Sequence, residues 1–101
     1  MNALFTLTRE LEVLNNAGLH TRVALLLFKT MERFQSEANL SKEGRIASCR
    51  SVLDLLSLGA AKGEKVLLTI QGEDAEQVLQ EMVTLFENRF YEDDNMQNTE
   101  F

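Results

Sequence analysis

The chain has 101 residues, 45% of them hydrophobic, which predicts one globular domain with a single core. Its formal net charge of −6 argues against nucleic acid as a partner, because binding by counterion release requires a basic surface. A single cysteine, Cys49, excludes an internal disulfide. The sequence predicts neither a signal peptide nor a membrane-spanning helix, so we expect a cytoplasmic protein without membrane insertion.

The first half of the chain predicts a strand followed by a long helix. Apolar and polar side chains alternate over residues 5–13, which is the period of a strand with one buried face, although Arg9 interrupts the apolar side. Residues 15–18 are predicted to form a turn, because Gly18 can adopt positive φ. An apolar stripe with helical spacing then predicts a helix from about residue 21 to residue 36.

The second half predicts a hairpin, a short helix, a strand and a second long helix. Residues 37–41 and 45–50 flank a turn that contains Gly44, and Ser51 can cap a short helix that stops at Gly59. Residues 65–71 predict an apolar strand, and Asp74 begins the last helix. This order predicts an α+β fold, in which helices pack on one face of a mainly antiparallel four-stranded sheet.

Acidic residues are concentrated at the C-terminal end. Four of the sixteen, Glu92, Asp93, Asp94 and Glu100, follow Tyr91. We therefore expect residues 1–91 to form the domain and residues 92–101 to form an acidic, flexible tail. No metal site is predicted, because one histidine and one cysteine leave only carboxylates as ligands, and no cofactor-binding motif is found.

His20, the only histidine, lies directly before the first predicted helix and is the candidate site of chemistry. The free N–H groups and the positive dipole end of a helix favour an anion, and Arg22 adds a guanidinium that can bind phosphate oxygens. An imidazole nitrogen is nucleophilic near neutral pH, so His20 is suited to carry a phosphoryl group. The residue pattern alone leaves a second interpretation open, in which His20 is a surface turn residue or a helix N-cap.

Two segments of the sequence carry a family resemblance. Residues 18–24 read GLHTRVA and resemble the signature Gly-Leu/Ile-His-Ala/Thr-Arg-Pro-Ala of HPr, the histidine phosphocarrier of bacterial sugar phosphotransferase systems. Residues 50–59 read RSVLDLLSLG and resemble the regulatory-serine segment of that family, Lys-Ser-Ile-Met-Gly-Val-Met-Ser-Leu-Gly. His20 and Ser51 are spaced as the family spaces its two phosphorylation sites, and the resemblance extends over residues 5–90.

The resemblance implies an open-faced β-sandwich and a phosphocarrier function. It implies that Enzyme I, phosphorylated from phosphoenolpyruvate, transfers a phosphoryl group to Nδ1 of His20, which passes it to a IIA domain. Arg22 is implied as a phosphate clamp, and the backbone N–H groups of Thr21 and Val23 can contact the same phosphate. Such a protein is a carrier rather than a turnover enzyme and needs no cofactor. We expect a monomer, because several partners must dock on one exposed surface.

The segment around Ser51 is the second site that the resemblance implies. Phosphorylation of Ser51 requires a serine kinase/phosphorylase, and a transcriptional regulator is a further implied partner. Ser51 also has an ordinary role as a helix N-cap. Residues expected to bind partners form an apolar surface with a basic rim near His20, and they are Thr21, Val23, Lys29, Arg50, Val52, Leu53 and Leu56.

The main departure from the family signature is Val23, where the family has a proline that presets helical φ. This departure leaves open the interpretation that the chain is a divergent paralogue with altered partners. An HPr-like regulatory module, which controls a transcription factor or a metabolic enzyme without sugar transport, is therefore the alternative function. A third interpretation makes His20 the general base of a small hydrolase, but no nucleophile or oxyanion constellation supports it.

Overall fold

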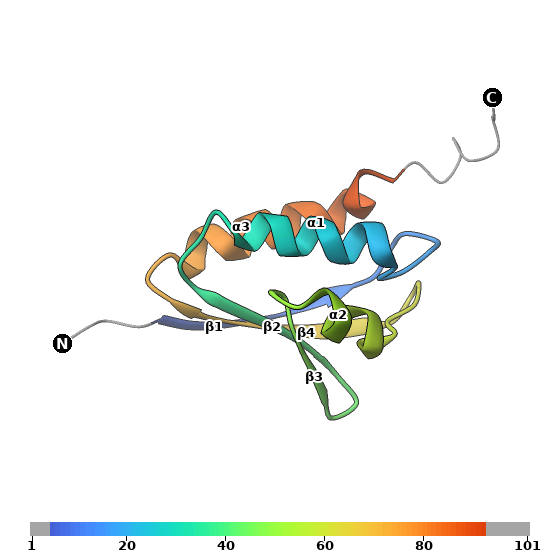
Figure 1. Cartoon of the computed structure of the whole chain (residues 1–101), viewed down its shortest axis with the longest axis horizontal. Helices are drawn as coiled ribbons and strands as arrows, with labels where there is room; N and C mark the ends of the chain where they lie inside the picture. The colour runs from blue at the N-terminus through green and yellow to red at the C-terminus, as the bar shows by residue number, and fades with distance from the viewer. Residues whose placement is uncertain (1–4, 93–101) are drawn as a thin grey trace.

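The computed structural model describes residues 5–92 and has the α+β architecture expected from the sequence (Figure 1). Strands β1 (Phe5–Glu12), β2 (Glu37–Lys42), β3 (Arg45–Ser48) and β4 (Lys65–Gly72) form one antiparallel sheet in the order β1-β4-β2-β3. The helical elements are α1 (Thr21–Met31), α2 (Val52–Leu58), α3 (Ala75–Glu87) and the short 3-10 segment η1 (Arg89–Tyr91). Helices α1 and α3 run side by side across one face of the sheet.

The core lies between this face of the sheet and the helices. Strand β1 pairs with β4 from Phe5 opposite Gly72 to Glu12 opposite Lys65, so the first strand of the sheet lies beside the last one in the sequence. The largest fully buried side chains come from every layer of the fold: Val13, Val23, Leu27, Met31, Leu40, Leu55, Leu58, Leu68, Ile70, Met82, Phe86 and Phe90. No helix within residues 5–92 is both long and apolar enough to cross a membrane.

Helix α1 begins at Thr21 as expected but ends at Met31, so the prediction that it continues to residue 36 was wrong. The following residues are held by distant polar groups. The carboxylate of Asp74 accepts hydrogen bonds from the backbone N–H of Gln35 (2.8 Å) and of Ser36 (2.9 Å), and from the Ser36 hydroxyl. These hydrogen bonds hold the pKa of Asp74 below its usual range, and the bond from the Ser36 hydroxyl has the largest effect. Tertiary contacts therefore override the helical pattern here.

Local turn and cap chemistry agrees with the sequence. Glu43 and Gly44 both have positive φ (53° and 80°), as a tight two-residue hairpin turn requires. Helix α2 has Ser51 as its N-cap, whose hydroxyl accepts a hydrogen bond from the backbone N–H of Asp54 (3.1 Å). The helix ends at Gly59 in the left-handed conformation.

The turn before α1 packs against the loop before β4, and this contact fixes where α1 begins. Gly18 has a φ of 69°, and the N–H of Leu19 donates to the carbonyl of Ala60 (3.0 Å). A Cβ at residue 18 would lie 2.5 Å from that carbonyl oxygen and 3.1 Å from the Cα of Ala61. The close approach of two backbone segments therefore requires glycine at residue 18.

We expect Gly18→Ala to destabilise the protein by about 1–3 kcal/mol more than Gly44→Ala, because overpacking is added to left-handed strain. Gly44 is a matched control, since it also has positive φ but a Cβ there would meet no atom within 4 Å. Urea unfolding of both variants measures the difference. Equal free energies of unfolding would contradict the close packing of the two loops.

Candidate functional site

The backbone of His20 forms the N-cap of α1, and its ring stands at the open end of that helix. The intrahelical hydrogen bonds begin with Ala24 N–H, which donates to the His20 carbonyl (2.9 Å), so the N–H groups of Thr21, Arg22 and Val23 have no acceptor inside the helix. The His20 side chain does not cap them, and the first turn contains no acidic residue. The His20 side chain is 36% exposed. An anion-binding helix end and a solvent-accessible imidazole therefore lie together.

Glu92 occupies this site, and only 11% of its side chain is exposed. Its Oε1 accepts a hydrogen bond from Asn15 Nδ2 (2.9 Å), and its Oε2 accepts one from Arg22 Nε (2.9 Å) and contacts His20 Nε2. Burial opposes ionisation of Glu92, but the hydrogen bonds from Asn15, Arg22 and His20 outweigh it and lower the pKa of this carboxyl. The site therefore already holds one anion, which the chain itself supplies.

A left-handed turn brings Glu92 back to the beginning of α1. Arg89, Phe90 and Tyr91 have φ values of 55°, 55° and 57°, which are unfavourable for side chains with a Cβ. The turn is held because Phe90 is fully buried and its ring packs edge-on against Phe86, with 4.7 Å between ring centroids. Arg22 Nη2 also donates to the Phe90 carbonyl. The aromatic anchor and Arg22 together stabilise a strained turn at the site.

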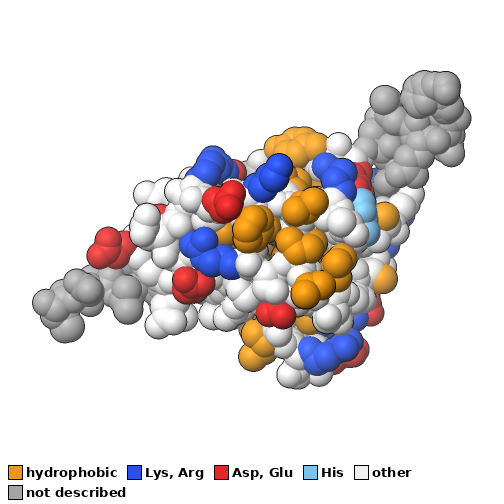
Figure 2. Space-filling view, in the orientation of Figure 1, with side chains coloured by type: hydrophobic (Ala, Val, Ile, Leu, Met, Phe, Trp, Pro, Cys, Tyr) orange, Lys and Arg blue, Asp and Glu red, His pale blue; other side chains and the backbone are white. Residues whose placement is uncertain are grey.

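The residues expected to bind partners divide into an exposed group and a buried group. Leu53 (76% exposed), Leu56 (37%) and Leu25 (42%) form an apolar surface on α1 and α2, which we call the α1–α2 patch. Figure 2 shows hydrophobic side chains gathered on this face, with the histidine at its edge. Val52 is half-buried, and Lys29 and Thr21 are exposed. Val23 is fully buried, so only its backbone can contact a ligand.

Arg50 was expected to form part of a basic rim, but its guanidinium is largely occupied by the protein itself. Its Nη2 donates to the carbonyls of Phe34 and Ser36 (both 2.9 Å), and its Nε lies 3.3 Å from Glu37 Oε1. The two hydrogen bonds hold the loop between α1 and β2 in place. Arg50 therefore has a structural role that its position beside Ser51 did not indicate.

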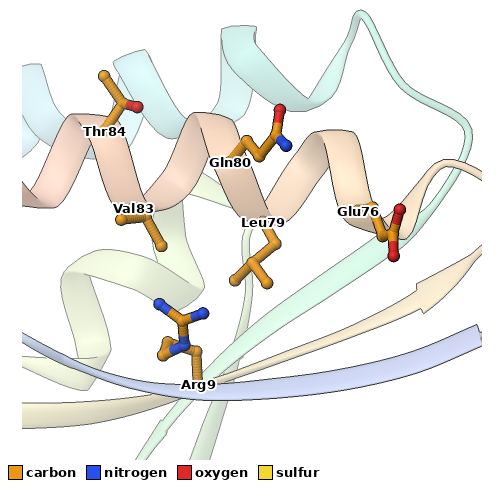
Figure 3. A pocket seen from close by; sticks show the side chains of 6 residues that line it. All are labelled: Arg9, Glu76, Leu79, Gln80, Val83 and Thr84. Atoms are coloured by element: carbon orange, nitrogen blue, oxygen red, sulfur yellow. The ribbon is translucent and has the colours of Figure 1, made fainter.

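A shallow groove of about 590 Å³ lies between α3 and β1, away from the predicted site residues (Figure 3). Its lining consists of Arg9, Glu76, Leu79, Gln80, Val83 and Thr84. The Arg9 side chain points from β1 toward Leu79 and Val83. This position explains why a charged residue can interrupt the apolar side of β1, since the helix does not seal the sheet there.

Comparison with known proteins identifies the family. The family model described as "PTS HPr component phosphorylation site" matches residues 7–88. The chain belongs to the HPr family. It is 41% identical over 87 residues to the phosphocarrier protein HPr of Xylella fastidiosa (strain Temecula1 / ATCC 700964), which covers 86% of this chain and 98% of that protein. It is 36% identical over 89 residues to the phosphocarrier protein NPr of Escherichia coli K12, covering 87% of this chain and 99% of that protein.

Solved structures of HPr proteins confirm the fold. HPr-C-His from Thermoanaerobacter tengcongensis superposes with a TM-score of 0.81 at 31% identity, covering 85% of this chain and 97% of that chain. The HPr of Bacillus anthracis str. Ames gives a TM-score of 0.76 at 25% identity, covering 80% and 96%. The open-faced α+β sandwich expected from the resemblance is therefore confirmed.

Sequence reasoning missed Glu92 and Asn15 as members of the site. Glu92 had been assigned to an acidic tail, of which residues 93–101 lie outside the described part of the chain. Asn15 had been interpreted only as a turn residue, yet its Nδ2 joins the Gly18 carbonyl (2.9 Å) to Glu92. No local pattern marks either role, because both depend on the position of the C-terminal turn.

We expect Glu92→Gln to lower the free energy of unfolding by about 1–2 kcal/mol at pH 5–7, because charge-assisted hydrogen bonds are lost. The pKa of Glu92 is lower in the folded protein than the value of about 4.3 usual for an unfolded chain. Its stabilising effect is therefore present above that value and is lost as the pH falls through the folded pKa. Urea unfolding of wild type and variant from pH 7 to pH 3 should show the difference shrinking below pH 5. A constant difference would contradict ionisation of Glu92 as its cause.

Proposed function

We propose that this HPr-family protein is a phosphocarrier that accepts a phosphoryl group on His20 from phosphorylated Enzyme I and passes it to a IIA component. The observation that carries this proposal is the exposed imidazole at the uncapped N-terminus of α1. Backbone N–H groups and the helix dipole favour a phosphoryl group bound at this point. The relatives named above are themselves described as phosphocarrier proteins.

Arg22 is proposed as the phosphate clamp. It already binds one anion, the Glu92 carboxylate, through Nε, and its side chain is 49% exposed. A guanidinium has five N–H donors, and Glu92 and the Phe90 carbonyl accept hydrogen bonds from only two of its three nitrogens, so Arg22 can also bind oxygens of a phosphoryl group on His20.

Phosphoryl donors and acceptors are proposed to dock on the α1–α2 patch. An exposed apolar surface beside the reactive histidine suits a transient complex, because burial of Leu53 and Leu56 supplies contact energy close to the reacting atom. Lys29 is exposed on the same helix as His20 and can attract an acidic partner.

Phosphorylation with phosphoenolpyruvate, Enzyme I and radiolabel tests the carrier function. We expect one acid-labile label on His20 and none on His20→Ala, since this chain has no other histidine. Arg22→Ala should slow labelling by about 10–100-fold, which corresponds to a charge-assisted contact of about 1.5–3 kcal/mol. Thermal unfolding controls for the fold of each variant. Acid-stable label, or label on His20→Ala, would show that another group accepts the phosphate, and absence of label would favour the regulatory module.

Ser51 is proposed as a regulatory phosphorylation site that controls docking. Its side chain is half-buried and already caps α2, while Asp54 places a carboxylate in the same first turn. A dianion on Ser51 would therefore add like charge beside Asp54 and next to the apolar Leu53. The expected effect is weaker partner binding rather than a change of fold.

We expect Ser51→Asp to raise the KM for Enzyme I severalfold while the circular dichroism spectrum stays unchanged, because aspartate is still an acceptable N-cap. Ser51→Ala is the control, and it should lower stability by about 1 kcal/mol through loss of the cap without altering KM. Steady-state phosphorylation assays measure both. The docking role of this segment would be refuted by equal KM values for Ser51→Asp and wild type.

A further inference from the structure

We propose that Glu92 is a positioning residue for phosphoryl transfer, which holds the His20 proton on Nε2 so that Nδ1 presents its lone pair to phosphorus. This inference rests on the proposed phosphocarrier function and deepens it. Glu92 thereby determines which of the two ring nitrogens reacts, although it lies far along the chain from α1 and its N-cap His20.

The contact between Glu92 and His20 decides the tautomer. An ionised carboxylate accepts hydrogen bonds but donates none, and a neutral imidazole carries one N–H. Because Glu92 Oε2 contacts Nε2, the ring proton must lie on Nε2. Nδ1 has no hydrogen-bond partner within residues 5–92 and is therefore left with a free lone pair. The nitrogen without a proton is the nucleophile.

The same carboxylate also stabilises the charge that forms during the reaction. The Nδ1 lone pair forms the new N–P bond, while the bond from phosphorus to its donor breaks and its electron pair leaves with the donor. No proton needs to move, because Nε2–H stays in place. Positive charge then develops on the ring, and the adjacent Glu92 carboxylate lowers its energy, as a buried carboxylate does for a catalytic histidine.

Two costly features of the structure hold Glu92 in this place. Three consecutive residues of the turn that delivers it, 89–91, have positive φ, and Phe90 is buried to anchor them. Asn15 is fully buried and turns Nδ2 toward Glu92, which leaves its Oδ1 without a hydrogen-bond partner in the part of the chain that the structure describes. Strain and an unsatisfied buried acceptor at one contact indicate that the contact is required for function.

The test uses phosphoramidate, a small phosphoryl donor that needs no protein docking surface. We expect wild type to be phosphorylated on Nδ1 alone, as assigned by ³¹P and ¹⁵N NMR. Glu92→Ala should give both the Nδ1 and the Nε2 products. Both Glu92→Ala and Glu92→Gln should react about tenfold more slowly, since a charge-assisted contact to the ring is lost. Before reaction, ¹⁵N shifts should show a single ring tautomer in wild type and a mixture in Glu92→Ala.

Glu87→Gln is the matched control, because it removes the same charge from an exposed glutamate at the end of α3. It should change neither the rate nor the phosphorylated nitrogen. A merely structural Glu92 would leave the tautomer and the product unchanged in its variants, and that result would overturn the inference. Faster reaction of both variants would also overturn it, because Glu92 would then be a competitor of the phosphoryl group. Failure of Enzyme I to label wild type would instead refute the proposed carrier function, while the NMR experiment would still decide the role of Glu92.

Discussion

The uncapped N-terminus of α1 is the constraint on which the site depends. The N-cap is a histidine, whose side chain does not bond to the helix N–H groups, so three amide donors face outward. Helix α2 shows the alternative, since the Ser51 hydroxyl satisfies one of its amides locally. A serine or aspartate at residue 20 would stabilise α1 but would occupy donors that an anion can use. The fold therefore gives up local stability at the residue where chemistry is proposed.

The turn before α1 and the turn after α3 meet at this helix end. Neither turn forms the site without the other. Gly18 sets the start of the helix through its close contact with Ala60, while the buried Phe90 sets the position of Glu92. Arg22 links the two segments by binding both Glu92 and the Phe90 carbonyl. A site assembled from the beginning and the end of a domain can form only when the whole domain has folded.

Features set by neighbours in the sequence could be predicted, and features set by distant residues could not. The positive φ of Gly18, the cap at Ser51 and the exposed histidine at a helix start all follow from local residue chemistry. The early end of α1 depends on hydrogen bonds to Asp74. The guanidinium of Arg50 is occupied by carbonyls in the loop between α1 and β2. Glu92 reaches the site through a left-handed turn of residues 89–91. None of these residues is glycine, so the sequence does not indicate positive φ there.

Side-chain exposure on α2 was also only partly predictable. The helix contains four leucines. Because they have the same side chain, residue type does not indicate which of them face a partner and which face the core. The structure buries Leu55 and Leu58 and exposes Leu53 and Leu56, because only one side of so short a helix meets α1 and β3.

The strand order has a consequence for synthesis of the chain on the ribosome. Strand β1 is made before β4, its one partner among the strands of residues 5–92, so its backbone groups begin to pair only when Lys65 has emerged and complete the pairing only with Gly72. During that interval an apolar edge would invite pairing with other nascent chains. Arg9, Glu10 and Glu12 place charges along β1, and charges on a strand oppose such pairing.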